Sequence, residues 1–422
     1  MMMHRTLQPP REGAMWIEPS AIKGHQQALK DINRMSIVRQ LCVHPGLSRT
    51  GLANAVELTK STVTLLVREL IDEGWLVEDE VVATGDLGRR PTPLFIDPER
   101  LVLVGCEVGI AGVRGVITSL TGEILARSKA AYRSATSAKA CLKILAGLVI
   151  DMVGKLRPSQ RVIGVGVGVP GGVEESTGFL HFAPNLRWRD VPIGEALHER
   201  FAGTALAGVP LFVQNEADVA VVGELEFNGG ESIDPLLYLS INQGVGAGVI
   251  VDKRLLTGYR GFAGEVGHMV LVPGGPACSC GRRGCAEALI GARAVLPETE
   301  GDWADAQSAL ESGDADVRRA VEKAATYLGV LLQNLATAYD PGRIVLGGAA
   351  VQLGEAFLEP ALRTLAEFSE AAGVSAPQVQ VSRFGADAVA LGAAALVRYR
   401  LTRSPISGWF SGIRPALTGE AA

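Results

Sequence analysis

The chain lacks a hydrophobic run long enough to cross a membrane. No apolar stretch reaches the roughly 18 residues of a membrane span, and the nearest candidate, Ile144–Val153, is interrupted by Asp151. The first residues, MMMHRTLQPPREG, contain no apolar core of a secretory signal. We therefore expect a cytoplasmic protein without membrane insertion.

Cysteine is also scarce. Six cysteines in 422 residues do not form a disulfide scaffold, and a chain of this length can bury a large core without one. Its length indicates two or three domains. Three of the cysteines, Cys278, Cys280 and Cys285, lie within eight positions, a spacing that favours a metal site.

A strong overall charge is missing as well. The net charge of −5 excludes a chain that is basic throughout, but phosphate neutralisation is local and needs only one basic face. Residues 23–70 carry seven basic and three acidic side chains, and GDLGRRPTP, further along, adds Arg89 and Arg90. This N-terminal region is therefore a candidate for DNA binding.

The pattern of residues 25–97 predicts a winged helix-turn-helix. After a disordered tail over residues 1–24, apolar residues recur at helical spacing from about Gln26. Ser48 can cap a second helix, KSTVTLLVRELIDEG predicts a third, and two strands around GDLGRRPTP predict a hairpin. The predicted DNA contacts are Lys60, Ser61, Thr64 and Arg68 on the third helix and Arg89 and Arg90 on the wing. The alternative is a small helical protein-interaction domain.

Glu57 is the weak position of this pattern. It lies in the link between the second and third helices, where such units often need a glycine for a positive φ. A side chain in that conformation costs on the order of 1 kcal/mol.

From Leu101 the sequence predicts an α/β domain. Buried strands alternate with helices and glycine-rich turns. Two similar passages, VGCEVGIAGVRGVI and LSINQGVGAGVIV, indicate a duplicated half. Two such lobes would enclose a cleft for a small ligand at the ends of their strands.

Several motifs in this region resemble those of the ROK family of repressors and sugar kinases. They are PGG at 170–172, HFAPNLRW at 181–188, QNEADVAVVGE at 214–224, GEVGH at 264–268, CSCGRRGCAE at 278–287 and DPGRIVLGG at 340–348. With the winged helix, the chain is most similar to the transcriptional regulators of that family. The resemblance implies two actin-like (ribonuclease H-like) lobes over residues 98–402, lobe one at about 98–220 and 385–402, lobe two at about 221–384, and a tail at 403–422.

The cysteine cluster is a predicted zinc site. With His268, the thiolates of Cys278, Cys280 and Cys285 offer the four N/S ligands that Zn²⁺ takes in closed structural sites. Four protein ligands leave no position for a water nucleophile. The resemblance likewise implies one structural Zn²⁺ per chain.

The resemblance also implies a sugar site. Its residues would be Asn215, Glu216, Glu265, His268 and Glu287, with Gly171, Gly172 and Asn185 as weaker candidates. Carboxylates accept hydrogen bonds from sugar hydroxyls. Because Glu265 and Glu287 lie close to zinc ligands in sequence, we expect metal binding to order both. For each residue alone, a helix cap or a solvated carboxylate is the alternative.

The kinase motifs are incomplete. The family's kinases carry Asp-x-Gly-x-Thr in the first glycine turn, where this chain has Glu107, Gly109 and Ala111. They also place an aspartate as general base where this chain has Glu216. Phosphoryl transfer depends on positioning, and a displacement near 1 Å can cost about 10²-fold in rate. The sequence therefore predicts a protein that is not an enzyme.

Together these features predict a sugar-responsive transcriptional regulator, a repressor of carbohydrate metabolism genes. Its expected partners are double-stranded operator DNA, a monosaccharide or sugar phosphate, and further copies of itself in a homodimer or homotetramer. An active ATP-dependent sugar kinase with a DNA-binding domain is the first alternative. A scaffold controlled by a protein partner, such as a sugar-transport phosphocarrier, is the second.

Overall fold

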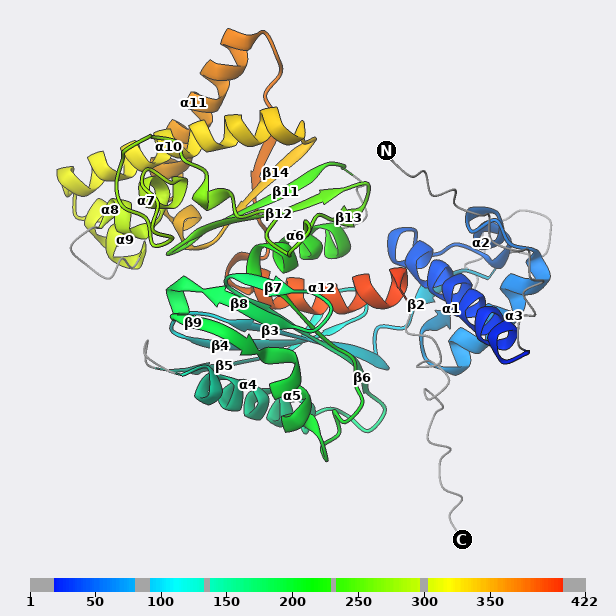
Figure 1. Cartoon of the computed structure of the whole chain (residues 1–422). Helices are drawn as coiled ribbons and strands as arrows, with labels where there is room; N and C mark the ends of the chain where they lie inside the picture. The colour runs from blue at the N-terminus through cyan, green and yellow to red at the C-terminus, as the bar shows by residue number, and fades with distance from the viewer. Residues whose placement is uncertain (1–18, 80–91, 133–136, 229–232, 297–302, 405–422) are drawn as a thin grey trace, which may run out of the picture.

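The computed structural model describes residues 19–79, 92–132, 137–228, 233–296 and 303–404. A small helical domain is followed by two lobes, each built on a five-stranded sheet (Figure 1). The winged helix-turn-helix and the two-lobed α/β domain expected from the sequence are both present. Within the described ranges, none of the helices combines the length and apolar character needed to cross a membrane.

The N-terminal domain consists of three helices and a short antiparallel pair of strands. They are α1 (Pro19–Val43), α2 (Arg49–Ala55), α3 (Lys60–Asp72), β1 (Leu76–Glu78) and β2 (Leu94–Ile96). Ser48 and Thr59 cap α2 and α3, because their hydroxyls accept hydrogen bonds from Gly51 and Thr62. The apolar stripe of α3 is buried against α1 and β1.

Two local features of this domain bear on the expectations from sequence, and the first of them differs. Helix α1 begins at Pro19, so it includes residues 19–24, and the prediction of a disordered tail over these residues is wrong. Proline fits a first helical turn, where its missing N–H has no partner to lose. Glu57 has a φ of 53°, so the link does place a side chain in the left-handed region.

Lobe one carries a five-stranded sheet in the order β10-β6-β3-β4-β5. Helix α4 lies on the outer face of this sheet, and α5 lies beside α4 and β10 (Figure 1). A three-stranded sheet borders the cleft, with 3-10 helix η1 (Pro184–Leu186) after its second strand. The bounds are β3 (Leu101–Val108), β4 (Gly112–Ser119), β5 (Ile124–Ala131), α4 (Ala138–Val153), β6 (Arg161–Val169), β7 (Gly172–Glu174), β8 (Phe179–Ala183), β9 (Trp188–Pro192), α5 (Ile193–Phe201) and β10 (Leu211–Asn215).

Lobe two carries a sheet in the order β13-β12-β11-β14-β15. Its helices pack around the long α10, which α11 accompanies (Figure 1). The bounds are β11 (Leu236–Ile241), β12 (Val245–Val251), β13 (Arg254–Leu255), η2 (Val266–His268), α7 (Ala286–Ile290), α8 (Ala292–Val295), α9 (Trp303–Glu311), α10 (Ala315–Tyr339), β14 (Arg343–Gly347), η3 (Ala349–Leu353), α11 (Glu355–Ala372) and β15 (Gln378–Val381).

The two sheets have the same topology. In each, three successive strands form an antiparallel meander, a fourth pairs in parallel with the first, and a fifth pairs in parallel with the fourth. The two passages that look alike in sequence are the first hairpins, β3–β4 and β11–β12. The duplication expected from the sequence is therefore present in the fold.

Two helices lie between the sheets. Helix α6 (Glu216–Phe227) packs on β11 and β12 of lobe two, and α12 (Ala388–Arg403) packs on β3 and β6 of lobe one. The two helices pack against each other, and α1 packs against α12 (Figure 1). The segment before α12 includes 3-10 helix η4 (Gly385–Asp387). One apolar cluster joins the N-terminal domain to this centre, because Met35, Val38, Leu391 and Leu401 all belong to it.

Candidate functional site

A cleft between the lobes gathers polar side chains from both. Lobe one contributes Gly171, Asn185 and Asn215, and Glu216 opens α6 beside them. Lobe two contributes the β11–β12 turn and the segment around η2. Seven of the eight residues proposed for sugar binding line this one cleft: Gly171, Asn185, Asn215, Glu216, Glu265, His268 and Glu287.

Gly172 is not among the lining residues. A Cβ atom at this position would lie 2.3 Å from the ring of Phe262, so the glycine is needed for packing behind the cleft. The cleft has further lining residues that are not among the predicted sugar ligands, including Phe182, Gly244, Val245, Gly246 and Ser279. The glycine-rich turn after β11 is visible in the sequence and could have identified Gly244, Val245 and Gly246 as lining residues.

Asn215 joins strand β10 to helix α6. Its side-chain oxygen accepts a hydrogen bond from the Ala217 amide at 2.8 Å, and its Nδ2 donates to the Gly171 carbonyl at 2.9 Å. The residue is therefore a helix cap that also holds the loop at Gly171. One N–H of the amide remains for a ligand.

Three carboxylates give the cleft an acidic lining. Burial, with Glu107 and Glu265 nearby, raises the pKa of Glu216 to about 7. Burial also raises the pKa of Glu265, which His268 opposes at 3.8 Å between Nε2 and Oε2. With Glu287, these groups can accept hydrogen bonds from several hydroxyls of one ligand.

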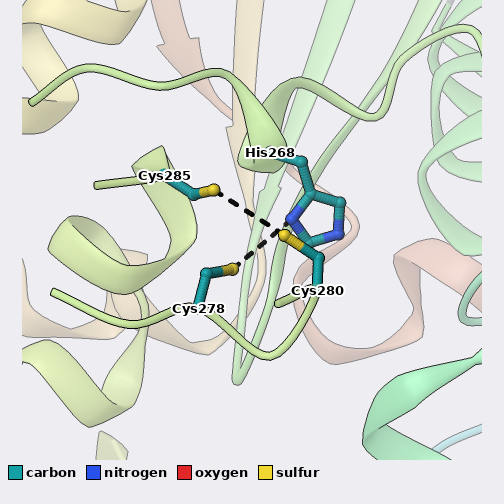
Figure 2. Close-up of side chains that lie close together, drawn as sticks. All are labelled: His268, Cys278, Cys280 and Cys285. Carbon is teal, nitrogen blue, oxygen red and sulfur yellow. Dashed lines mark hydrogen bonds between the residues drawn. The ribbon is translucent and has the colours of Figure 1, made fainter. Parts of the chain in front are cut away.

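Beside the cleft, four potential metal ligands converge (Figure 2). His268 ends η2, Cys278 and Cys280 lie in the following loop, and Cys285 immediately precedes α7. The loop turns sharply at Gly284, where φ is +75° and a Cβ atom would lie 1.6 Å from the Val272 carbonyl oxygen. A glycine is therefore required for this path.

The geometry of the four side chains fits one metal ion. Their ligand atoms all lie within 4.8 Å of one another, with 3.6 Å between Cys278 Sγ and His268 Nδ1 and 3.7 Å between Cys280 Sγ and Cys285 Sγ. Tetrahedral coordination with metal–sulfur bonds of about 2.3 Å requires sulfur–sulfur separations of about 3.8 Å. This group can therefore bind a metal ion.

The metal group and the cleft share residues. Nδ1 of His268 faces Cys278, whereas Nε2 faces Glu265. Ser279 Oγ, between two of the cysteines in sequence, donates a hydrogen bond to Glu287 Oε1 at 2.6 Å. His268 and the loop that gathers the cysteines thus also contact two cleft carboxylates, Glu265 and Glu287.

At the first glycine turn of lobe one, an ion pair occupies the kinase-like position. Glu107 and Arg114 are directly opposite each other on β3 and β4, with 3.3 Å between Oε2 and Nη1. Arg114 also donates a hydrogen bond to the Ala386 carbonyl, in the segment before α12. The Glu107 carboxylate is thus paired with the chain's own guanidinium, although burial still raises its pKa.

Helix α3 presents a polar face to solvent. Lys60, Ser61, Thr64 and Arg68, the residues proposed for DNA contacts on this helix, are all exposed. Leu65 lies among them with 57% of its surface exposed, whereas the opposite stripe is buried. Arg89 and Arg90 lie outside the described residues.

A larger hollow, of about 930 Å³, lies between β5 and α4. Its polar lining is mostly lysine and arginine, with Asp151 as the acidic residue. It contains neither the convergent carboxylates nor the metal group, so the inter-lobe cleft is the stronger candidate for a sugar.

Comparisons with known proteins agree with this geometry. The ROK family profile matches residues 103–400, and a winged helix-turn-helix DNA-binding profile matches residues 30–77. A crystal structure described as a ROK family transcriptional regulator, homologous to the E. coli MLC protein, superposes with a TM-score of 0.74 at 22% identity. It covers 90% of this chain and 98% of its own, and at that identity it shows the fold.

Curated relatives include both regulators and kinases. A putative xylose repressor of Caldicellulosiruptor sp. (strain Rt8B.4) is 31% identical over 395 residues, which are 89% of this chain and 97% of that protein. A glucokinase of Halalkalibacterium halodurans is 29% identical over 317 residues, 70% of this chain and 94% of that enzyme. Since the family profile spans most of the chain, this protein belongs to the ROK family.

Proposed function

We propose that this protein is a sugar-responsive DNA-binding repressor of carbohydrate metabolism genes. The observation that carries the proposal is one chain with a winged helix-turn-helix, whose α3 face is exposed, and a cleft lined by carboxylates. Similarity to a putative xylose repressor along nearly the full length of both chains supports it.

On DNA, helix α3 enters the major groove. Lys60 and Arg68 contact phosphates or base edges, and the hydroxyls of Ser61 and Thr64 add short hydrogen bonds. The wing residues Arg89 and Arg90 are proposed for the adjacent minor groove. A homodimer or homotetramer presents two such helices to a pseudo-palindromic operator.

The effector is an uncharged monosaccharide rather than a sugar phosphate. Glu216, Glu265 and Glu287 line the cleft, and no lysine or arginine is among the described lining residues. A phosphate would meet negative charge without a cation to bind it, whereas sugar hydroxyls donate to carboxylates.

The metal is Zn²⁺ with a structural role, one ion per chain. Three thiolates and an imidazole are the ligands that zinc takes in closed sites. His268 and Ser279 extend from this group to Glu265 and Glu287. Removing the metal is therefore expected to disorder the sugar site.

The cleft binds sugar without phosphorylating it. Ala111 provides no hydroxyl for a nucleotide phosphate, and the Glu107 carboxylate forms an ion pair with Arg114. A sugar-transport phosphocarrier as a controlling partner is the alternative from another class; it predicts no direct response to free sugar.

Two measurements test this function. The first measurement is the melting temperature of the protein with D-xylose, D-glucose or their phosphates. At least one of the two free sugars should raise it. That sugar should change the affinity for an operator selected from random duplex DNA by about tenfold. Glu265→Gln should lose the sugar response and keep DNA binding. Stabilisation by a sugar phosphate alone would contradict the effector class, and the absence of any DNA binding would contradict the repressor.

A further inference from the structure

The first residue of helix α6 lies in the cleft, and its last turn lies beside α12, near the DNA-binding domain. Its first residue, Glu216, lies in the cleft, and its cap, Asn215, lines the same space. Its last turn contains Glu226, next to α12. Twelve residues at about 1.5 Å each separate these ends by about 18 Å.

Between its ends, α6 crosses α12 at two glycines. A Cβ atom at Gly223 would lie 3.0 Å from the Gly392 Cα, and one at Gly392 would lie 2.1 Å from the Val219 carbonyl oxygen. The two backbones are therefore in direct contact at this point. Neither glycine carries a Cβ atom that would block a small rotation of one helix against the other at this point.

Beyond the crossing, Glu226 holds two arginines of α12. Its carboxylate accepts a hydrogen bond from Arg398 Nε at 2.8 Å and pairs with Arg403 Nη1 at 2.6 Å. Arg398 also donates to the Leu120 carbonyl at 2.7 Å. The side chains of Glu226 and Arg398 are 7% and 4% exposed, so water screens this contact little.

Helix α1 of the DNA-binding domain meets the same cluster. Arg39 Nη1 donates a hydrogen bond to the Thr402 carbonyl at 3.4 Å, and α1 packs against α12. Burial, followed by Arg403, lowers the pKa of Arg39, and Glu226 opposes this. The carboxylate of Glu226, in the last turn of α6, therefore interacts electrostatically with the guanidinium of Arg39 on α1.

We propose that α6 is a lever that carries sugar binding from the cleft to the DNA-binding domain. It pivots on α12 at the Gly223–Gly392 crossing, and Glu226 transmits the motion to α1 through Arg398 and Arg403. The lever rests on the proposed function, since it assumes a sugar at Glu216 and DNA at α3. Glu226 is a positioning residue: it contacts neither ligand, yet it sets how strongly one affects the other.

The test is a comparison of Glu226→Gln with Glu175→Gln. Glu175 pairs with Arg400, also on α12, but it follows β7 of lobe one and is not part of α6, so it is a matched control. For each protein, three constants are measured: affinity for D-xylose (or D-glucose, whichever stabilises the wild type), and operator affinity without and with saturating sugar.

In Glu226→Gln, the two separate affinities should stay within about threefold of wild type. The sugar-induced change in operator affinity should fall by at least about fivefold, within the usual range of coupling between sites. Glu175→Gln should retain the full change. A merely structural role for Glu226 would lower the melting temperature and leave the coupling intact.

Arg39→Gln is the second variant, because Arg39 is partly exposed and its loss keeps the α6–α12 pairs. Arg39→Gln should also reduce the coupling, and it keeps the lever testable if Glu226→Gln does not fold. If the folded variants keep the wild-type coupling, the lever is refuted and the proposed function is not. A wild type whose operator affinity ignores sugar refutes the proposed function, and the lever with it.

Discussion

At the scale of single residues, Glu216 lies where its charge is disfavoured. Burial and two neighbouring carboxylates raise its pKa to about 7, from an ordinary value of about 4.3. In the folded chain it therefore retains its proton to higher pH than in the unfolded chain. A protonated carboxyl can donate as well as accept a hydrogen bond, which widens the set of sugar hydroxyls it can bind.

This shift predicts the sign of a pH dependence. Because the folded pKa is raised, the contribution of Glu216 to the free energy of unfolding is complete below about pH 4. It declines as the pH rises through 7. When the pH rises from 5.5 to 8, the free energy of unfolding of Glu216→Gln should fall less than that of the wild type, by on the order of 2 kcal/mol. Denaturant unfolding at both pH values measures it, and parallel losses would contradict the shift.

A second prediction concerns Cys280. Cys280→Ala removes one of the four converging ligands, so zinc content should fall well below one ion per chain. Sugar affinity should fall with it, by on the order of tenfold, because the loop also positions Glu265 and Glu287. Elemental analysis and sugar titration provide the readouts. Cys141→Ala, in α4 of lobe one, is the control; zinc loss with unchanged sugar affinity would separate the two sites.

Sequence could predict the chemistry of the site better than its contacts. The metal ligands form one motif with a separate histidine, so their grouping was predictable from spacing and ligand type. The ion pair of Glu107 and Arg114 was not predicted, since it follows from the antiparallel register of β3 and β4. Ser279 was missed for a similar reason: only the folded loop places its hydroxyl on Glu287.

At the scale of elements, predictability followed the length of the pattern. Helix α3 has a full apolar stripe, and its bounds lie within two residues of those of the predicted segment KSTVTLLVRELIDEG. The strands β7, β8 and β9 are three to five residues long. Such strands contain too few alternations to be recognised from sequence, and this small sheet was not predicted.

Helix α3 allows two kinds of DNA contact to be separated. Arg68→Ala should weaken operator binding and reduce the slope of log affinity against log salt by about one, because one phosphate contact is lost. Leu65→Ala should leave the slope unchanged and relax sequence preference, since an exposed leucine suits a thymine methyl group. Titrations at several salt concentrations, on operator and on unrelated duplex, measure both. Equal effects of the two changes on the slope would contradict this division.

At the scale of the whole molecule, the duplicated lobes create both the cleft and the route out of it. Equivalent sheets face each other across α6 and α12, so any relative motion of the lobes moves these helices. Helix α1 packs on α12 within one continuous apolar cluster. The sequence indicated the duplication from two similar hairpins. It could not indicate this contact, because the contact joins segments more than 350 residues apart.

Phosphoryl transfer is also a property of the whole molecule, because one lobe must hold the nucleotide while the cleft holds the sugar. The wild-type protein should form no ADP that depends on sugar, at saturating Mg²⁺ and ATP. Arg114 is paired with Glu107, Ala111 provides no hydroxyl, and Glu216 is one methylene longer than an aspartate. Ala111→Thr, Glu107→Asp and Glu216→Asp together should restore a trace at most, since Arg114 on β4 would still pair with the carboxylate at position 107. Wild-type turnover in the usual enzymatic range of about 1–10³ s⁻¹ would instead make the protein a sugar kinase that carries a DNA-binding domain.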